Sequence, residues 1–132
     1  MIDIKELSVG NWVKFPHGID KIDELCMWAN YAAPATNRPV HVLRLEPIEI
    51  APEILEKNGF EFHSFMSDYP ADYVIAVGKY KEKVNHLDDE NLWCFTLYYN
   101  ENIRVVHQFN IRFVHQLQNA LTLCGIDKEI EL

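Results

Sequence analysis

Two His-Gln steps, His107-Gln108 and His115-Gln116, follow each other closely and sit in nearly the same local sequence. Imidazole nitrogens bind transition metals and exchange protons near neutral pH, so matched histidines can form two halves of a metal or catalytic site. Such a site needs three or four ligands about 2.0 to 2.3 Å from one ion, and neither step belongs to a recognisable ligand motif. The elements that carry the two steps therefore decide between a shared site and a coincidence.

The first step is predicted to lie in a strand and the second in a helix. Residues 103–109 follow a turn and place Ile103, Val105, His107 and Phe109 at alternate positions, the period of a strand. From Ile111 to Cys124 apolar residues recur every three or four positions, Asn110 can cap the start, and Gly125 can close the end. Nothing in this spacing brings the imidazoles together, so we expect no metal ligand, no catalytic residue and no cofactor.

A polar margin beside the apolar stripe of this helix holds the candidate binding residues His115, Gln118 and Asn119. These side chains can contact a partner, or they can hydrogen-bond the backbone of a neighbouring strand and fix the helix in place. Trp12 and Trp28 can add aromatic anchors to a binding surface, with burial in the core as the alternative for each.

The rest of the chain reads as short strands and one further short helix. Residues 9–15 alternate and end on a Pro-His-Gly turn, which predicts a strand that opens a hairpin. Pro52 suits a first helical position and Gly59 a left-handed stop, so a helix is expected from Pro52 to Asn58. Further strands are expected at residues 21–25, 40–45, 73–84 and 92–99 and from residue 60, whereas residues 29–39 are expected to form a long surface loop.

These elements predict an α+β fold. We expect an antiparallel sheet of about five to seven strands, or a small barrel closed by the amino-terminal hairpin. The C-terminal helix should pack on one face, and one short additional helix should complete the fold. Residues 1–132 are expected to form a single domain, because a chain of this length can bury one core without disulfides or metals.

The net charge limits the classes of partner that we expect, and the cysteines indicate the compartment. A formal net charge of -8 opposes approach to phosphate backbones and anionic lipid, so we expect neither nucleic acid nor membrane as a partner. The first residues show no secretory signal pattern, and no apolar run reaches the length of a membrane span. The 3 cysteines are widely spaced and suit a reducing compartment, so a cytoplasmic protein is expected.

Three stretches carry a family resemblance: LSVGNWVKF at residues 7–15, EPIEIAPEILEKNGFEF at residues 46–62 and FVHQLQNALTLCGIDKEIEL at residues 113–132. Together they resemble a family of small uncharacterised Bacteroidetes proteins, often associated with prophages or other mobile elements. The most specific part is Val-His-Gln-Leu-Gln-Asn at residues 114–119. Residues 27–39 depart from the family pattern and look inserted. The resemblance implies a mobile-element accessory protein and carries no established activity.

The expected function is therefore that of a small, acidic, cytoplasmic interaction or accessory protein without enzymatic activity. Its partner would be another protein of unknown identity, and a homo-oligomer stays open. Two alternatives also stay open. A metal-dependent hydrolase or nuclease would join the two histidines to an acid such as Asp68, Asp72, Asp88 or Asp89. An acidic nucleic-acid mimic would instead occupy a DNA-binding protein.

Overall fold

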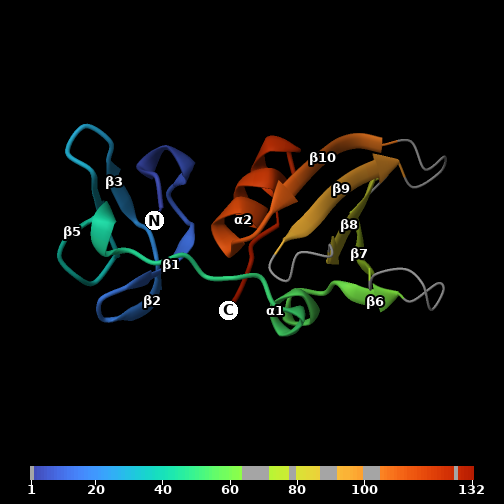
Figure 1. Cartoon of the computed structure of the whole chain (residues 1–132), viewed down its shortest axis with the longest axis horizontal. Helices are drawn as coiled ribbons and strands as arrows, with labels where there is room; N and C mark the ends of the chain where they lie inside the picture. The colour runs from blue at the N-terminus through green and yellow to red at the C-terminus, as the bar shows by residue number, and fades with distance from the viewer. Residues whose placement is uncertain (1, 64–71, 78–79, 87–91, 100–104, 127) are drawn as a thin grey trace. The chain divides into compact units, whose positions relative to one another are not determined.

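A computed structural model describes residues 2–63, 72–77, 80–86, 92–99, 105–126 and 128–132. Within these residues ten strands, two α-helices and two short 3-10 helices alternate along the chain (Figure 1). All strand pairs within the three sheets are antiparallel. The predicted α+β fold, with a C-terminal helix and one other short helix, is confirmed.

The chain divides into two compact units. The first comprises residues 1–49 and 113–119, and the second comprises residues 50–112 and 120–132. The C-terminal helix α2 (Val114–Leu123) contributes its first residues to the first unit and its last residues to the second. The single domain expected for residues 1–132 stays a prediction.

The first unit contains two small sheets. β1 (Trp12–Phe15) and β2 (Gly18–Lys21) form the hairpin predicted around the Pro-His-Gly turn. β3 (Glu24–Cys26), β4 (Tyr31–Ala33) and β5 (Val40–His41) form a three-stranded sheet in that order. The short helices η1 (Ile4–Glu6) and η2 (Val42–Arg44) flank these sheets in the sequence.

Apolar side chains from most of these elements, and from the segments between them, build one core in the first unit. Among its deepest members are Val13 and Ile22, which are 0% and 1% exposed. They pack in a cluster with Ile2, Ile4, Leu7, Phe15, Ala32, Val42 and Leu45. This core fixes the backbone from which the residues of the candidate site project.

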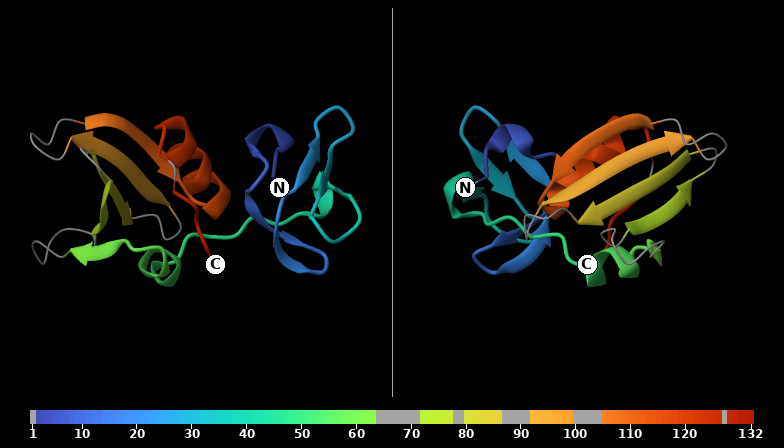
Figure 2. Two further views of the ribbon diagram at one scale, coloured as in Figure 1. Left: turned by 180° about the vertical axis from the view of Figure 1, so that it is seen from behind. Right: turned by 45° about the vertical axis from the view of Figure 1, so that its right-hand side comes forward.

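The second unit contains a five-stranded sheet in the order β10-β9-β8-β7-β6. Figure 2 shows strands of this sheet lying side by side. Its strands are β6 (Glu61–His63), β7 (Asp72–Val77), β8 (Tyr80–His86), β9 (Trp93–Tyr99) and β10 (Val105–Ile111). Helix α1 (Pro52–Lys57) precedes β6, and Leu55, Phe60, Val84 and Phe95 are buried. Within the described residues β6 and β10 are the ends of the sheet, so the small-barrel alternative is wrong.

Several strand predictions need correction. The strand expected at residues 21–25 is split, because Ile22 still pairs with β1 through Asn11 O while Asp23 N already bonds Ala33 O of the next sheet. The strand expected at 73–84 is the hairpin of β7 and β8, paired up to Val77 and Tyr80. The strand expected at 40–45 ends at His41, whose Nδ1 accepts from Leu43 N at 3.2 Å and caps η2.

The segment at residues 29–39, expected to be a surface loop, contains a strand. Its Tyr31–Ala33 stretch is the central strand β4, and Ala32 and Ala33 are 1% and 9% exposed. Small side chains let this strand lie close to the core, although they gave no hydrophobic alternation to read.

The repeated His-Gln steps do lie in a strand and a helix. His107 is exposed in β10, and His115 is fully buried in α2. The helix begins at Val114, three residues later than expected, because Ile111 still pairs with Trp93 in the sheet. Asn110 pairs with Cys94 in the same ladder, so its predicted role as the helix cap is wrong.

Candidate functional site

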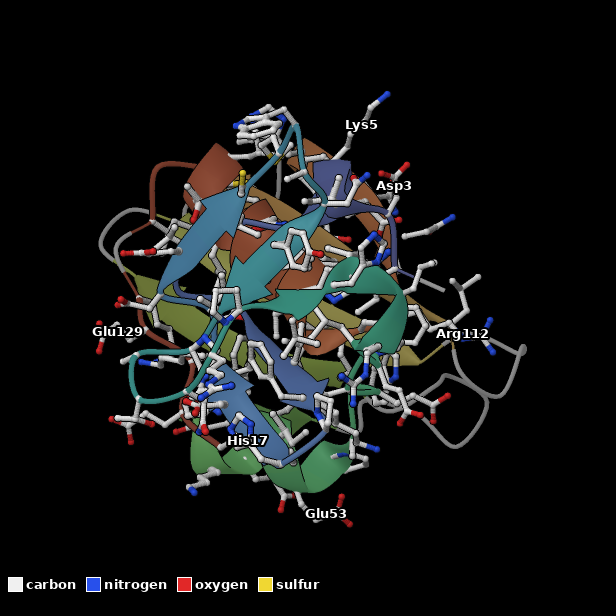
Figure 3. All side chains as sticks on the ribbon, turned by 90° about the vertical axis from the view of Figure 1, so that its left-hand side faces the viewer. Asp3, Lys5, His17, Glu53, Arg112 and Glu129 are labelled. Carbon is white, nitrogen blue, oxygen red and sulfur yellow. The ribbon has the colours of Figure 1, made fainter. Side chains whose placement is uncertain are left out.

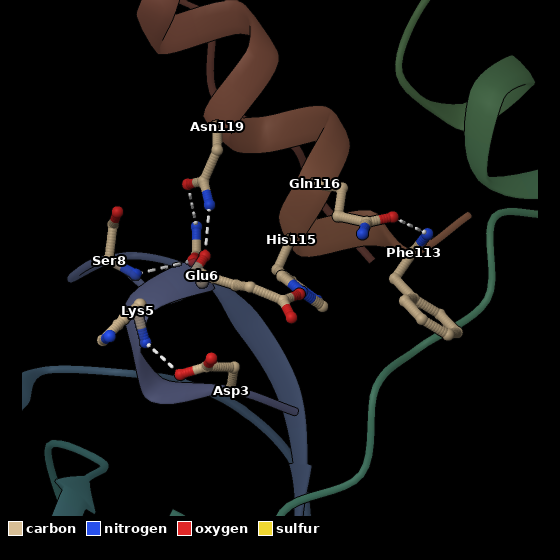
Figure 4. A network of polar contacts seen from close by, with 9 residues as sticks. Asp3, Lys5, Glu6, Ser8, Phe113, His115, Gln116 and Asn119 are labelled. Carbon is tan, nitrogen blue, oxygen red and sulfur yellow. Dashed lines mark hydrogen bonds and ion pairs between the residues drawn. The ribbon is translucent and has the colours of Figure 1, made fainter. Parts of the chain in front are cut away.

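The first turn of α2 is fixed by contacts within the first unit. Phe113 precedes the helix and has no capping oxygen, and the Oε1 of Gln116 accepts from Phe113 N at 3.1 Å in its place. This is the return half of a capping box, in which the third helical residue satisfies the N–H before the helix. Val114 N also donates to Ile48 O at 2.8 Å. These bonds fix the start of the helix from which His115, Gln118 and Asn119 project, and Figure 4 shows His115 and Asn119 on the side of Glu6.

Gln118 binds the edge of β1 with both ends of its amide. Its Oε1 accepts from Trp12 N at 2.9 Å, and its Nε2 donates to Gly10 O at 3.0 Å. Two residues further along, Lys14 exchanges backbone hydrogen bonds of 2.9 and 3.0 Å with Glu46. Since alternate residues of a strand present their backbone groups to the same side, Gln118 and Glu46 cover one edge of β1.

Asn119 anchors the turn that leads into β1. Its Nδ2 donates to Glu6 O, and its Oδ1 accepts from Asn11 Nδ2 at 3.1 Å. The Oδ1 of the buried Asn11 accepts in turn from Ser8 N at 2.8 Å. The two amides thus bond each other and the backbone at Glu6 and Ser8, which satisfies the buried amide of Asn11.

His115 is fully buried and binds Glu6 through one nitrogen. Its Nε2 lies 3.2 Å from Glu6 Oε2, while the Glu6 side chain is 42% exposed. The imidazole stacks on Phe113, with ring centroids 5.8 Å apart. Its Nδ1 has no hydrogen-bond partner among the described residues. A neutral ring with its proton on Nε2 fits these contacts, because it donates to the carboxylate and leaves only a weak acceptor unpaired.

Burial lowers the pKa of His115, against the opposing effects of its hydrogen bond to Glu6 and of the Glu6 charge. The unfolded chain therefore binds a proton at His115 more readily than the folded chain does. Above the ordinary pKa of 6.5 both states hold a neutral ring, and the group makes no difference to stability. As the pH falls through 6.5 and then through the lowered pKa, the folded state loses stability.

We expect His115→Gln to reduce the loss of stability between about pH 7 and pH 5, because glutamine has no proton to gain in this range. The measurement is urea unfolding at several pH values for the wild-type and variant proteins. His107→Gln, which changes an exposed histidine of β10, is the control and should keep the wild-type pH profile. Parallel profiles of stability against pH for all three proteins would contradict the lowered pKa of His115.

All three predicted binding residues meet in the first unit, and their described contacts are to their own chain. Gln118 and Asn119 perform the alternative role considered from the sequence, since both bond backbone at the start of β1. We name Glu6, Asn11, Gln116 and the three predicted residues the margin cluster. Whether the margin cluster also binds a partner stays a prediction.

Sequence reasoning did not identify Glu6, Asn11 or Gln116. A signal was present, because the two stretches LSVGNWVKF and VHQLQN carry the family resemblance and here contact each other. Their separation by more than a hundred residues hid the contact. Gly10 takes a positive φ of 93°, so its place in the first stretch reflects a backbone turn that favours glycine.

Replacing Gln118 by alanine should destabilise the protein by about 1 to 3 kcal/mol, because it removes both bonds to the edge of β1. Gln118→Glu should not restore the stability, since a carboxylate can accept from Trp12 N but cannot donate to Gly10 O. Thermal and urea unfolding measure both variants. Asn37→Ala, at an exposed amide, is the control. Equal stability of Gln118→Ala and this control would show that the two hydrogen bonds of Gln118 do not stabilise the fold.

The β3–β4 hairpin presents a second candidate surface in the same unit (Figure 3). Trp28 in its turn is 91% exposed, Met27 is 51% exposed and Tyr31 is 42% exposed. Tyr31 also lines a pocket of about 370 Å³, here called the first pocket, together with Glu24, Leu25, Cys26, Ala32, Ala33 and Pro39. We call Met27, Trp28, Tyr31 and this pocket the hairpin face.

The two tryptophans proposed as anchors differ in their surroundings. Trp12 is half-buried, and the Nζ of Lys21 lies 5.1 Å from its ring. Trp28 belongs instead to the hairpin face. The sequence suggested both as aromatic anchors of a binding surface. The structure favours Trp28, because it is far more exposed than Trp12.

The described part of the chain contains no group of three or more histidine, cysteine, aspartate or glutamate side chains placed to hold a metal ion. His107 stacks on Phe109 at 6.0 Å, whereas His115 contacts Glu6 and Phe113. Asp68, Asp88 and Asp89 lie outside the described residues, as does the side chain of Asp72. The metal alternative is therefore a question for chemical analysis.

No protein-family model, no curated protein and no solved structure matches the chain. Among the described residues, neither helix is long and apolar enough to cross a membrane. The resemblance to small Bacteroidetes proteins stays a prediction.

Proposed function

We propose that the protein is a non-enzymatic interaction protein that binds another protein through the hairpin face. The observation that carries this proposal is the indole of Trp28, which is 91% exposed in the turn between β3 and β4. Large aromatic side chains are usually at least partly buried, and one held almost entirely in water forgoes the stabilisation that its burial would give. A partner that covers it recovers this free energy.

The surroundings of Trp28 support the same function. Tryptophan and tyrosine are enriched among the residues that dominate binding energy, and they act best beside a pocket from which water is displaced. Tyr31 and the first pocket adjoin the hairpin turn, and most of the pocket's lining side chains are apolar. The backbone beneath is fixed, because Ala32 in the middle of β4 is part of the core.

The cellular role follows from charge and from the resemblance. A net charge of -8 disfavours nucleic acid and anionic membranes as partners, which leaves protein as the preferred one. The resemblance points to a cytoplasmic accessory protein of a mobile element. In this proposal the margin cluster holds the first unit together, and the hairpin face meets the partner.

Site-specific photo-crosslinking tests the proposal. A photoreactive phenylalanine analogue replaces Met27, which is 51% exposed next to Trp28 in the hairpin turn, in one variant, and Leu123, which is 73% exposed in α2, in a control variant. Trp28 itself is kept, so the proposed contact stays intact, and both variants are expressed in the cells that produce the protein. Discrete adducts with another protein from position 27 and none from position 123 are expected. No adduct from position 27, or the same adducts from both positions, would contradict the proposal.

Metal analysis of the purified protein separates this function from the enzymatic alternative. Stoichiometric zinc, manganese or iron that survives purification would favour a metal-dependent hydrolase or nuclease. Metal contents well below one ion per chain are expected for the interaction protein.

A further inference from the structure

A second pocket of about 420 Å³ lies in the first unit. Its apolar walls come from Ile2, Ile4, Val42 and Leu43, and polar groups come from Asp3, Asn30 and His41. Leu43 is 65% exposed, although it is a large apolar side chain. The second pocket therefore resembles the first, because it is mostly apolar and has an exposed apolar side chain in its lining.

Tyr31 and His41 connect the two pockets. Tyr31 lines the first pocket and His41 lines the second. The two residues are direct partners across β4 and β5, so their side chains project from the same face of the sheet. Their rings meet edge to face with centroids 5.5 Å apart. A ligand that crosses this pair can reach both pockets.

The polar groups of the pockets indicate what kind of ligand fits. Of the residues that line the two pockets, Glu24 and Asp3 carry charges, and both are exposed carboxylates. The Nδ1 of His41 accepts from Leu43 N, so the neutral ring carries its proton on Nε2 and can donate it. Apolar hollows, two carboxylates and a ring N–H suit a ligand with apolar groups, cations and carbonyl acceptors.

We propose that the hairpin face and the second pocket together bind one extended, positively charged peptide segment of a partner protein. One apolar side chain of this segment enters the first pocket, a neighbouring group covers Trp28 in the adjoining turn, and another apolar side chain enters the second pocket against Leu43. Basic side chains pair with Glu24 and Asp3, and a peptide carbonyl accepts from His41 Nε2. This inference rests on the proposed function and specifies its partner.

Charge argues against the other occupants. A second copy of the chain that docked by the same surface would place its own Glu24 and Asp3 against the same two carboxylates. Nucleic acid would meet the same repulsion through its phosphates. A cationic peptide gains from these charges, and it supplies the carbonyl groups that the ring N–H of His41 can bind.

Selection from a random peptide library displayed on phage, with the full-length protein as bait, tests this inference. Peptides with a net positive charge and two apolar positions separated by a short spacer should be enriched. Synthetic copies of the enriched peptides are then titrated against the variants by fluorescence anisotropy. Trp28→Ala should weaken binding about thirty-fold or more and Leu43→Ala about tenfold or more, since each removes one apolar contact.

Charge variants test the cationic character of the peptide. The double variant Asp3→Asn with Glu24→Gln should weaken binding about tenfold, and higher salt should weaken binding to the wild-type protein. The asparagine at position 3 keeps an oxygen for the bond that Asp3 Oδ1 accepts from Lys5 N. His41→Asn likewise keeps an acceptor for Leu43 N while removing the ring donor, and should also weaken binding. Glu53→Gln, an exposed charge change in α1, is the matched control and should bind normally.

The outcomes separate this inference from the proposed function. Enriched peptides that need Trp28 but are neutral or acidic, or that bind Leu43→Ala normally, would overturn the inference and leave the proposed function standing. Enriched peptides that bind Trp28→Ala as tightly as the wild-type protein would overturn both. Failure to enrich any peptide would overturn the peptide inference, and photo-crosslinking from position 27 would then decide the proposed function alone.

Discussion

Leu117→Ala is expected to lower the free energy of unfolding by about 2 to 5 kcal/mol, the largest loss of stability predicted for a single change in this chain. Leu117 is 0% exposed at the centre of the apolar stripe of α2, next to the margin cluster. Truncation removes the buried methyl groups and leaves a cavity that the surrounding residues fill only partly. Urea unfolding followed by circular dichroism gives the difference between variant and wild type.

The control for this prediction is Leu123→Ala, which makes the same chemical change at a residue that is 73% exposed near the end of the same helix. It should change the free energy of unfolding by no more than about 0.5 kcal/mol. Equal losses for the two variants would show that the helix turns a different face to its core.

Trp28→Ala is expected to weaken binding of a selected peptide by about 2 kcal/mol or more, which corresponds to roughly thirty-fold or more in the dissociation constant. The indole is almost fully exposed, so its removal costs the folded protein little and the bound complex much. Val9→Ala replaces another exposed apolar residue of the first unit, outside both pockets, and should bind normally. Normal binding by Trp28→Ala would contradict the proposal that the hairpin face binds the peptide.

Local sequence patterns predicted the elements whose signals are short-range. The helix from Pro52 to Asn58 is observed as α1 (Pro52–Lys57), with proline at its start and the positive φ of Gly59 after it. The β1–β2 hairpin follows from alternation and a turn motif. The apolar stripe of α2 is also observed, because a three-and-four spacing over ten residues has few other solutions.

Other features depend on contacts that no local pattern reveals. β4 is a strand because Tyr31–Ala33 pairs with β3 on one side and β5 on the other. Its two alanines have low strand propensity and show no alternating apolar pattern that would predict a strand. The start of α2 moved because Ile111 completes the ladder with Trp93. Tertiary pairing overrode local propensity at both positions.

The candidate site shows the same division. Helical spacing correctly grouped His115, Gln118 and Asn119, but it could not name their partners. Those partners lie more than a hundred residues earlier, at Glu6 and at the turn into β1. The exposure of Trp28 also required the fold, since its sequence neighbours would suit a buried strand equally well.

The division between a structural margin cluster and a binding hairpin face is tested most directly by measuring stability and peptide affinity on the same two variants. Trp28→Ala should lose peptide binding while its free energy of unfolding stays within about 0.5 kcal/mol of the wild type. Gln118→Ala should lose about 1 to 3 kcal/mol of stability and, at a temperature where it is folded, bind the peptide with unchanged affinity. The opposite pattern, in which folded Gln118→Ala fails to bind and Trp28→Ala binds normally, would place the binding site at the margin cluster.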